Sequence, residues 1–326
     1  MITKNLAEEL FWTPLQGDVD KLIILNGYAT PSAITWLIEN IQNRVTHQIS
    51  LYLTLGMVAY DGISKSAHDA FVELTNQVNE QQYAPKISRL ECSYIYKNPI
   101  HGALYIWLKK QNPVTAFMGS ANFTQSVFVQ NIRREFMQSI SAEEAYEYYT
   151  STIDDSVICT YDEIEEEIKI TGTKSLFDNE NNLISDLEAQ NKDKIILSLL
   201  KSKKKEMGSR SSLNWGQRGN RNRNEAYIPI HQNNRTKNFF PVGSHFCVIT
   251  DDKKSLILRV EQDNNKAITT PYNNALLGEY FRNRLGLANG AFVSLSDLER
   301  YGRTDVTFYK IDDEQYYMDF SSPNTR

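Results

Sequence analysis

The residue types best suited to chemistry in this chain gather between positions 101 and 135. A lone histidine, His101, precedes one apolar run, and Ser120 and Asn122 follow a second. The apolar runs, residues 104–108 and 114–118, predict two buried strands, and the polar residues between them predict a turn. We therefore expect His101 to meet the hydroxyl and amide side chains at one end of a hairpin.

Such a set suits phosphoryl transfer by a nucleophilic imidazole. A neutral histidine attacks phosphorus, a cation neutralises the phosphate oxygens, and Ser and Asn side chains donate hydrogen bonds to the developing charge. Glu135 would hold the tautomer of His101 by accepting its other N–H. The alternative is structural: His101 ends a buried strand, and residues 119–122 form only a turn.

The same segment resembles the phospholipase D superfamily motif, in which His-x-Lys is followed after a short gap by Gly-Ser-x-Asn. The positions that match are His101, Gly119, Ser120 and Asn122. The resemblance implies that Ser120 and Asn122 hold the phosphate and that Glu135 orients His101. Position 103 departs from the motif, because Ala103 stands where the phosphate-binding Lys is expected. An isolated Ala in an otherwise intact motif indicates either an engineered loss of activity, which we favour, or a natural one.

Four later segments resemble the NgoFVII-type restriction endonucleases, and they are residues 212–218, 224–229, 277–282 and 301–306. In that family a phospholipase-D-type nuclease domain precedes a B3-like β-barrel that binds DNA. The resemblance implies an α/β nuclease domain, with a phospholipase D-like mixed sheet and flanking helices, followed by a mainly β B3-like pseudobarrel domain. It also implies a type II-like restriction enzyme that hydrolyses double-stranded DNA without a metal ion or other cofactor, through a phosphohistidine intermediate.

The resemblance also bears on partners. The superfamily chemistry needs two copies of the motif, and this chain holds one. A homodimer is therefore implied, with the two His101 side chains meeting at a twofold interface. One histidine would attack phosphorus, and the other would protonate the leaving oxygen. Some relatives act beside a separate ATP-dependent helicase-like protein, which makes such a subunit a further candidate partner.

Two polar segments in the second half carry residue types that contact base edges. Arg bonds bidentately to guanine, while Asn and Gln suit adenine. The first segment contributes Arg210, Asn214, Trp215, Gln217, Arg218, Arg221 and Arg223. The second contributes Asn264, Asn265, Lys266, Thr269, Thr270, Tyr272 and Asn273. The resemblance implies that these are the two arms with which a B3-like domain grips the major groove, whereas composition alone fits a solvated basic loop equally well.

The order of predicted elements indicates two domains. Strands and helices alternate up to about position 149, which favours an α/β sheet, and short strands follow position 213, which favours a small barrel. A chain of 326 residues is long enough for both cores. We place a nuclease and dimerisation domain at residues 1–172, a linker region at 173–205 and a DNA-recognition domain at 206–326.

Charge is segregated along the chain, although the net charge is −5. Residues 142–193 hold 15 acidic and 3 basic side chains, whereas residues 201–237 hold 10 basic and 2 acidic ones. The basic block thus overlaps the first proposed DNA-contacting segment. No apolar run approaches the ~20 residues that span a bilayer, the first residues do not resemble a secretory signal, and the three cysteines are widely spaced. A reducing cytoplasm fits these features.

Two other function classes fit parts of the sequence. A sequence-specific DNA-binding protein with a degenerate nuclease domain would bind its site without cleaving it, and Ala103 favours that class. A lipid-cleaving phospholipase D is disfavoured by the single motif copy, the Arg-rich segment and the absence of a membrane-seeking amphipathic segment.

Overall fold

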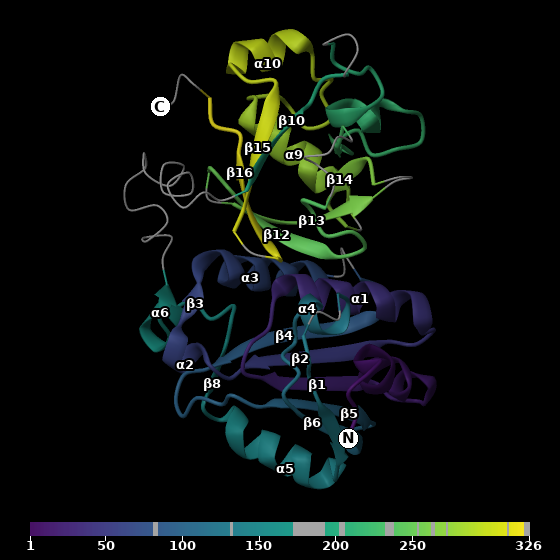
Figure 1. The fold of residues 1–326 in the computed structure, drawn as a ribbon, viewed down its shortest axis with the longest axis vertical. Helices are drawn as coiled ribbons and strands as arrows, with labels where there is room; N and C mark the ends of the chain where they lie inside the picture. The colour runs from purple at the N-terminus through teal and green to yellow at the C-terminus, as the bar shows by residue number, and fades with distance from the viewer. Residues whose placement is uncertain are drawn as a thin grey trace. The chain divides into compact units, whose positions relative to one another are not determined.

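The computed structural model describes residues 1–80, 84–130, 133–171, 193–201, 206–231, 238–252, 254–261, 265–271, 273–311 and 313–322. Two residues of the second predicted DNA-contacting segment, Asn264 and Tyr272, lie outside this set. The chain separates into two compact units, residues 1–175 and 176–326 (Figure 1). Each unit is described by itself.

The first unit is built on a mixed sheet with the strand order β7-β6-β5-β1-β2-β4-β8. Its strands are β1 (Lys21–Asn26), β2 (Ile49–Leu55), β4 (Ile87–Ile95), β5 (Ala103–Lys109), β6 (Asn112–Gly119), β7 (Met137–Ile140) and β8 (Ser156–Ile158). The three strands β1, β2 and β4 are parallel, whereas β5, β6, β7 and β8 pair antiparallel. Two short strands, β3 (Ile63–Ser64) and β9 (Ile170–Thr171), form a separate parallel pair.

Helices cover both faces of this sheet (Figure 1). On one face lie α1 (Pro31–Arg44) and α3 (Lys65–Asn79), and on the other lies α5 (Ala142–Ile153). Each helix begins at a residue suited to it: Pro31 opens α1, and Ser64 caps α3 by accepting a hydrogen bond from the Ala67 N–H. The shorter helices are η1 (Glu8–Trp12), η2 (Pro14–Gln16), α2 (Val58–Asp61), α4 (Gln125–Phe128) and α6 (Ile164–Glu167). The α/β architecture predicted from the sequence is confirmed.

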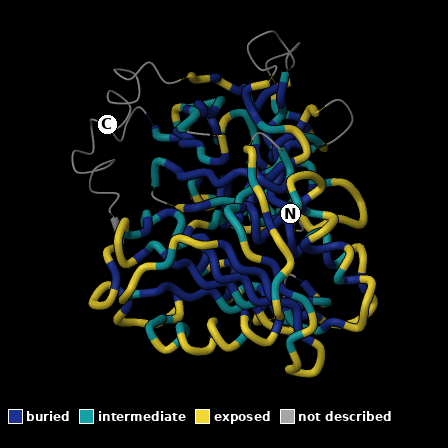
Figure 2. Tube along the Cα trace, turned by 60° about the horizontal axis from the view of Figure 1, so that its bottom comes forward, coloured by how far each residue is buried: buried dark blue, intermediate teal, exposed yellow. Residues whose placement is uncertain are grey.

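The central strands are buried along most of their length because the helices enclose them (Figure 2). The alternation of side chains splits the core in two. Tyr105 and Trp107 of β5 belong to the cluster with η1 and α1. Leu104 and Ile106 belong to the cluster with α5. The near-continuous apolar run of β5 in the sequence thus reflects a strand buried on both faces.

The β5–β6 hairpin fixes which residues meet at its open end. Its turn residues, Lys110 and Gln111, both have positive φ (48° and 69°), which gives a tight two-residue turn whose twist matches the strands. From this turn the register runs to the pair Ala103 and Gly119 at the open end. The predicted hairpin is therefore present, and the start of β5 lies next to the end of β6.

The second unit is mainly β, with the strand order β10-β15-β16-β12-β13-β14-β11. Its strands are β10 (Lys194–Ser198), β11 (Ile228–Pro229), β12 (His245–Thr250), β13 (Ser255–Glu261), β14 (Ala267–Thr269), β15 (Asp305–Lys310) and β16 (Gln315–Asp319). Only β12 and β16 pair in parallel among these strands of the described residues. The two ends of the order, β10 and β11, contact each other. The sheet therefore nearly closes on itself, which confirms the predicted pseudobarrel.

Strand β10 falls inside residues 173–205, the segment that the sequence predicts to be a linker region. It pairs antiparallel with β15, and its Ile195 and Leu197 side chains are buried in the core of the second unit. The short apolar run at residues 195–197 fits a short helix or a short strand equally well, so the sequence alone leaves the two open.

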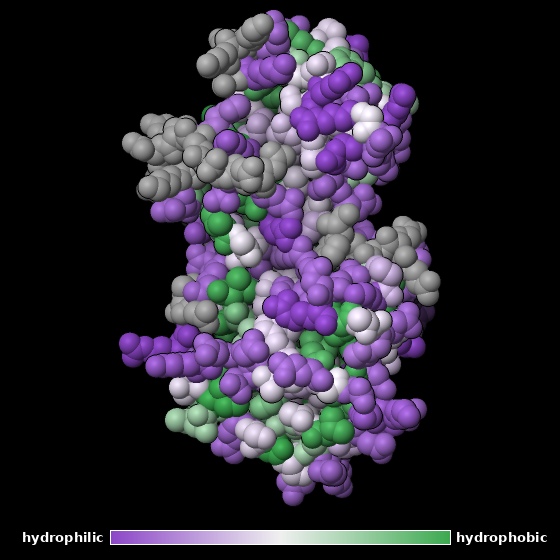
Figure 3. Space-filling view, turned by 90° about the vertical axis from the view of Figure 1, so that its right-hand side faces the viewer, coloured by the Kyte–Doolittle hydropathy of each residue, from purple (hydrophilic) through white to green (hydrophobic). Residues whose placement is uncertain are grey.

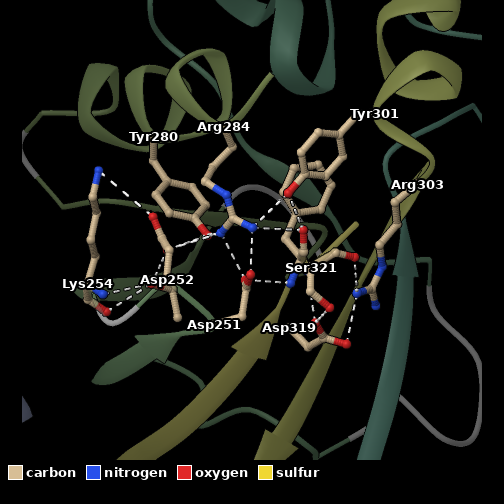
Figure 4. A network of polar contacts seen from close by, with 11 residues as sticks. Asp251, Asp252, Lys254, Tyr280, Arg284, Tyr301, Arg303, Asp319 and Ser321 are labelled. Atoms are coloured by element: carbon tan, nitrogen blue, oxygen red, sulfur yellow. Dashed lines mark hydrogen bonds and ion pairs between the residues drawn. The ribbon is translucent and has the colours of Figure 1, made fainter. Parts of the chain in front are cut away.

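In the described part of the second unit, the sheet is joined by helices α9 (Ala275–Arg284) and α10 (Leu295–Tyr301) and by the 3-10 turn η3 (Ser212–Gln217). Arg284 ties α9 to α10 and to the turn after β12 (Figure 4). Its guanidinium donates to the Asp251 carboxylate at 2.9 and 2.5 Å and to the Tyr301 hydroxyl at 2.7 Å. Burial lowers the pKa of Arg284, but the bonds to Asp251 outweigh this effect and raise the pKa above its usual value.

Candidate functional sites

His101 lies in the loop that enters β5, at the edge of the sheet where β1 and β2 end. The loop is held by backbone bonds to the residues after those strands: the Gly27 N–H donates to the Gly102 carbonyl, and the Ile100 N–H donates to the Gly56 carbonyl, both at 2.9 Å. Gly56 is required here, because a Cβ at this position would lie 2.2 Å from the Ile100 carbonyl oxygen. The histidine side chain is therefore presented to solvent from a fixed backbone.

Ser120 and Glu135 are brought together on the neighbouring strand ends. Ala103 pairs with Gly119, so the residues that follow β6 begin next to the His101 loop. The Ser120 hydroxyl donates to Glu135 Oε2 at 2.5 Å and accepts from the Phe136 N–H at 3.2 Å. Glu135 and Ser120 thus form one hydrogen-bonded unit. The role of Glu135 in orienting His101 stays a prediction, since the hydrogen bond found for its carboxylate is the one to Ser120.

The imidazole of His101 has a neighbour that sequence analysis missed. The ring of Tyr28 meets the ring of His101 edge-on, with 5.7 Å between their centroids. The Tyr28 hydroxyl donates to Asp61 Oδ2 at 2.6 Å, and this bond raises the pKa of Tyr28 above its usual value. No hydrogen bond joins the His101 imidazole to another described residue. Tyr28, which Asp61 holds by this bond, therefore packs against one side of the His101 ring.

Position 103 lies opposite a buried amide whose oxygen accepts no hydrogen bond from the described residues. Asn26 ends β1 and is the register partner of Ala103 on β5, so their side chains share one face of the sheet. Its Nδ2 donates to the Tyr105 hydroxyl at 2.9 Å and to the Ala121 carbonyl at 3.2 Å. Its Oδ1 is buried and has no hydrogen-bond partner among the described residues. An uncompensated buried carbonyl of this kind costs about 1–3 kcal/mol.

In the second unit, the residues that follow the first predicted DNA-contacting segment lie beside the second one. The Ile230 N–H donates to the Lys266 carbonyl at 2.7 Å, and the Ala226 N–H donates to the Asn274 carbonyl at 3.1 Å. Strands β11 and β14, which adjoin these bonds, pair antiparallel. The polar face that carries the first segment is visible in Figure 3, where hydrophilic residues dominate the surface of this unit.

Within these segments, exposure separates candidate DNA contacts from structural residues. The side chains that are exposed belong to Arg210, Arg218, Arg221, Arg223, Asn265, Lys266 and Asn273. Among them, Arg221 forms an ion pair with Glu225 at 2.5 Å and stacks over the Trp215 ring with 4.1 Å to its centroid. Trp215 thus packs within the first segment.

Four other predicted residues make contacts inside the protein. Asn214 is fully buried and bonds to the Gly208 and Val293 carbonyls through Nδ2. Gln217 donates to the Gly290 carbonyl at 3.0 Å. Thr269 and Thr270 are buried as well. Because these four side chains are engaged inside the protein, the exposed side chains remain as candidate DNA contacts. Sequence analysis included the other four because a polar residue type does not reveal whether the side chain points outward.

Sequence analysis missed the role of Arg282, which holds the first predicted DNA-contacting segment in place. Its side chain is fully buried, and its guanidinium donates to four carbonyls, those of Leu213 (3.0 Å), Asn224 (3.4 Å), Gly278 (3.1 Å) and Ala291 (2.8 Å). Burial lowers its pKa below the usual value. Gly278 lets the first segment approach α9, because a Cβ there would lie 1.7 Å from the Asn224 carbonyl oxygen. Arg282 therefore holds both ends of the first segment against α9.

The described residues show no cluster of three or more His, Cys, Asp or Glu side chains arranged to hold a metal ion. All three cysteines, Cys92, Cys159 and Cys247, are free and buried. Among the described helices none is both long and apolar enough to span a membrane.

Comparison with known proteins agrees with this two-part arrangement. The family model for the NgoFVII restriction endonuclease N-terminal PLD domain matches residues 4–166, which is half of the chain. The model for the NgoFVII C-terminal B3-like DNA-binding domain matches residues 187–312. A search of curated proteins gives no match. The chain therefore belongs to the NgoFVII restriction endonuclease family, with a PLD nuclease domain followed by a B3-like DNA-binding domain.

Proposed function

We propose that this protein is a sequence-specific endonuclease of double-stranded DNA, of the type II-like restriction class, whose nucleophile is His101. One observation carries the proposal: an exposed histidine is held on a fixed loop at the sheet edge where Ser120 and Asn122 follow the paired strand. This is the arrangement that a nucleophile and two phosphate-oxygen donors require.

The reaction would take place in two displacements. His101 attacks phosphorus, a nitrogen–phosphorus bond forms, and one phosphorus–oxygen bond of the DNA backbone breaks. The His101 side chain of a second copy donates the proton to the leaving oxygen. Water then attacks the phosphorus, the nitrogen–phosphorus bond breaks, and the histidine of the second copy takes up the proton of the water, which releases the phosphate end and restores both imidazoles. No metal ion takes part in these steps.

Position 103 decides the activity of this chain. The family motif places a phosphate-binding cation there, and Ala103 supplies none. Asn26 supports this view, because its Oδ1 lies beside position 103 and has no hydrogen-bond donor among the described residues. An ammonium group at residue 103 would supply that donor.

A homodimer would supply the second histidine, and exposed apolar residues next to the site support it. A pocket of about 550 Å³ opens between the His101–Leu104 segment and α5. Met118 and Tyr148 line it and are 50% and 51% exposed. Apolar side chains this exposed favour a protein interface. Met118→Glu is expected to give a monomer in analytical ultracentrifugation, and an unchanged mass would contradict this interface. A separate ATP-dependent helicase-like subunit remains a further candidate partner.

The experiment that tests the proposed function compares the chain with its Ala103→Lys variant on plasmid DNA in excess EDTA. Discrete fragments are expected from the Ala103→Lys protein and none from the parent chain. The matched control carries both Ala103→Lys and His101→Ala, and it must be inactive if His101 is the nucleophile. Inactivity of the Ala103→Lys protein would contradict the proposal.

One observation favours a second function, namely the absence of a cation at position 103. A sequence-specific DNA-binding protein with a degenerate nuclease domain would bind one site tightly and cleave nothing, even as the Ala103→Lys variant. Selection of bound fragments from a random DNA pool, followed by the cleavage assay on the selected site, separates the two functions.

A further inference from the structure

A cleft of about 620 Å³ is lined by Glu135, the hydrogen-bond partner of Ser120. One wall is the N-terminal segment Thr3–Leu6, and the other is the segment Arg133–Phe136. The two walls are held together by a backbone bridge, in which the Ile2 N–H donates to the Met137 carbonyl at 2.6 Å and the Met137 N–H donates to Ile2 at 2.8 Å. The cleft is therefore a built feature of the nuclease unit.

Three cations line this cleft, and none of them has a carboxylate partner among the described residues. Lys4, Arg133 and Arg134 are exposed, and none of them forms an ion pair or a side-chain hydrogen bond with another described residue. Some cations of the same unit pair with carboxylates, as Lys65 does with Asp69, Arg89 with Glu91, and Lys109 with Asp18. Unpaired cations around one concavity, on a chain whose net charge is −5, indicate an anion as the missing partner.

Glu135 connects this cleft to the proposed phosphate site. Its carboxylate lines the cleft and accepts the hydrogen bond from Ser120. A DNA strand whose scissile phosphate lies at Ser120 would carry its neighbouring phosphates past Arg133 and Arg134. Guanidinium groups bind phosphate bidentately, and the Lys4 ammonium adds a point charge.

We infer that the cleft between Thr3–Leu6 and Arg133–Phe136 binds backbone phosphates of the DNA strand next to the scissile phosphodiester. This inference rests on the proposed function, because it needs DNA at Ser120. It assigns a sequence-independent role to Lys4, Arg133 and Arg134, distinct from base recognition by the second unit.

The test uses the full chain with Ala103 retained, so that binding is measured without cleavage. Affinities for a fluorescent duplex that carries the selected site, and for an unrelated duplex of equal length, are measured between 50 and 200 mM salt, a range over which about six to ten phosphate contacts change affinity by orders of magnitude. The variants are Lys4→Ala, Arg133→Ala and Arg134→Ala. The matched control is Lys110→Ala, which removes an exposed cation from the turn at the far end of the β5–β6 hairpin.

Each cleft variant is expected to make the negative slope of log K against log salt shallower by about 0.9, as the loss of one phosphate contact does. Each should also weaken binding to both duplexes equally. The control is expected to leave the slope unchanged. Arg134→Lys should retain the slope, because a point charge still displaces a counterion. Slopes of the three Ala variants equal to that of Lys110→Ala would overturn the inference.

The two proposals fail separately. If the Ala103→Lys protein cleaves DNA while the cleft variants keep the parental slope, the nuclease proposal stands and the cleft assignment is wrong. If the slopes fall as expected but the Ala103→Lys protein is inactive, the cleft binds DNA and the catalytic proposal is wrong.

Discussion

Asn26 and Ala103 lie directly opposite each other on β1 and β5, and the buried Oδ1 of Asn26 has no hydrogen-bond partner among the described residues. Opposed side chains on neighbouring antiparallel strands have their Cβ atoms about 4.5–5.5 Å apart. A long cationic side chain at position 103 would thus pass beside Oδ1 on its way to the phosphate site. The pair links the missing catalytic cation to an unsatisfied acceptor in the core.

A double-mutant cycle tests this link. Ala103→Lys and Asn26→Ala are made singly and together, and the free energies of unfolding are measured in urea. We expect an interaction energy of about 0.5–3 kcal/mol, because the new ammonium group can donate to the Asn26 oxygen only when both side chains are present. The control cycle combines Ala103→Lys with Ser93→Ala on β4, three strands away. Additivity in both cycles would show that Asn26 does not support a cation at position 103.

Tyr28 is expected to position His101 for reaction. In the Ala103→Lys protein, Tyr28→Phe keeps the ring contact with His101 but loses the hydrogen bond to Asp61. The net value of such a bond is about 0.5–1.5 kcal/mol, so kcat should fall roughly two- to tenfold with little change in KM. Tyr161→Phe is the control, since Tyr161 makes an equivalent exposed bond to Glu163. Equal rate constants for the two variants in single-turnover cleavage assays would show that Tyr28 does not position His101.

Local patterns in the sequence predict the hairpin that builds the site. The apolar runs of β5 and β6 and the polar residues between them are short-range signals, because a tight turn pairs the two strands that it joins. A register shift between Trp107 and Leu108 moves the pairing by one residue but keeps the open end at Ala103 and Gly119. His101 and Ser120 could therefore be placed at one end of the hairpin without a structure. The alternation of strands and helices similarly predicts the mixed sheet, since each parallel pair needs a crossover.

Long-range contacts and burial could not be predicted in the same way. Asp61 lies 33 residues from Tyr28, and no pattern in the sequence connects the two. Asn214 has the residue type of a base-contacting side chain, yet both ends of its amide bond to the protein backbone. Arg282 looks like one more basic residue on a helix, but it is fully buried. In each case the side chain's partner, rather than its type, decides its role.

Arg282 should be essential for the shape of the first DNA-contacting segment. Arg282→Met keeps most of the buried volume but leaves the carbonyls of Leu213, Gly278 and Ala291 without this donor. Because hydrogen bonds to charged groups contribute about 1.5–3 kcal/mol each, the free energy of unfolding should fall by roughly 3 kcal/mol or more. The control is Arg300→Ala, an exposed cation whose ion pair with Asp297 contributes little. Similar losses for both variants would contradict the role of Arg282.

The pH dependence of stability should report on Asp319, which ends β16 beside Arg303 (Figure 4). Burial raises the pKa of Asp319, but hydrogen bonds from Ser321 and the ion pair with Arg303 at 2.8 Å outweigh it, so its pKa lies below the usual value. The folded pKa is therefore lower than the unfolded pKa of about 3.9. The resulting stabilisation is fully present above the unfolded pKa and is lost as the pH falls through the folded pKa.

Asp319→Asn should accordingly lower the free energy of unfolding at pH 7 and flatten its fall between about pH 5 and pH 3. Asp313→Asn is the matched control, because the exposed ion pair of Asp313 with Lys310 contributes little to stability. Urea unfolding of the three proteins across this range checks the expectation. If the Asp319→Asn protein lost stability on acidification as steeply as the parent, Asp319 would not be the carboxylate responsible, and the acid sensitivity of the second unit would have to come from another ion pair, such as that of Arg284 with Asp251.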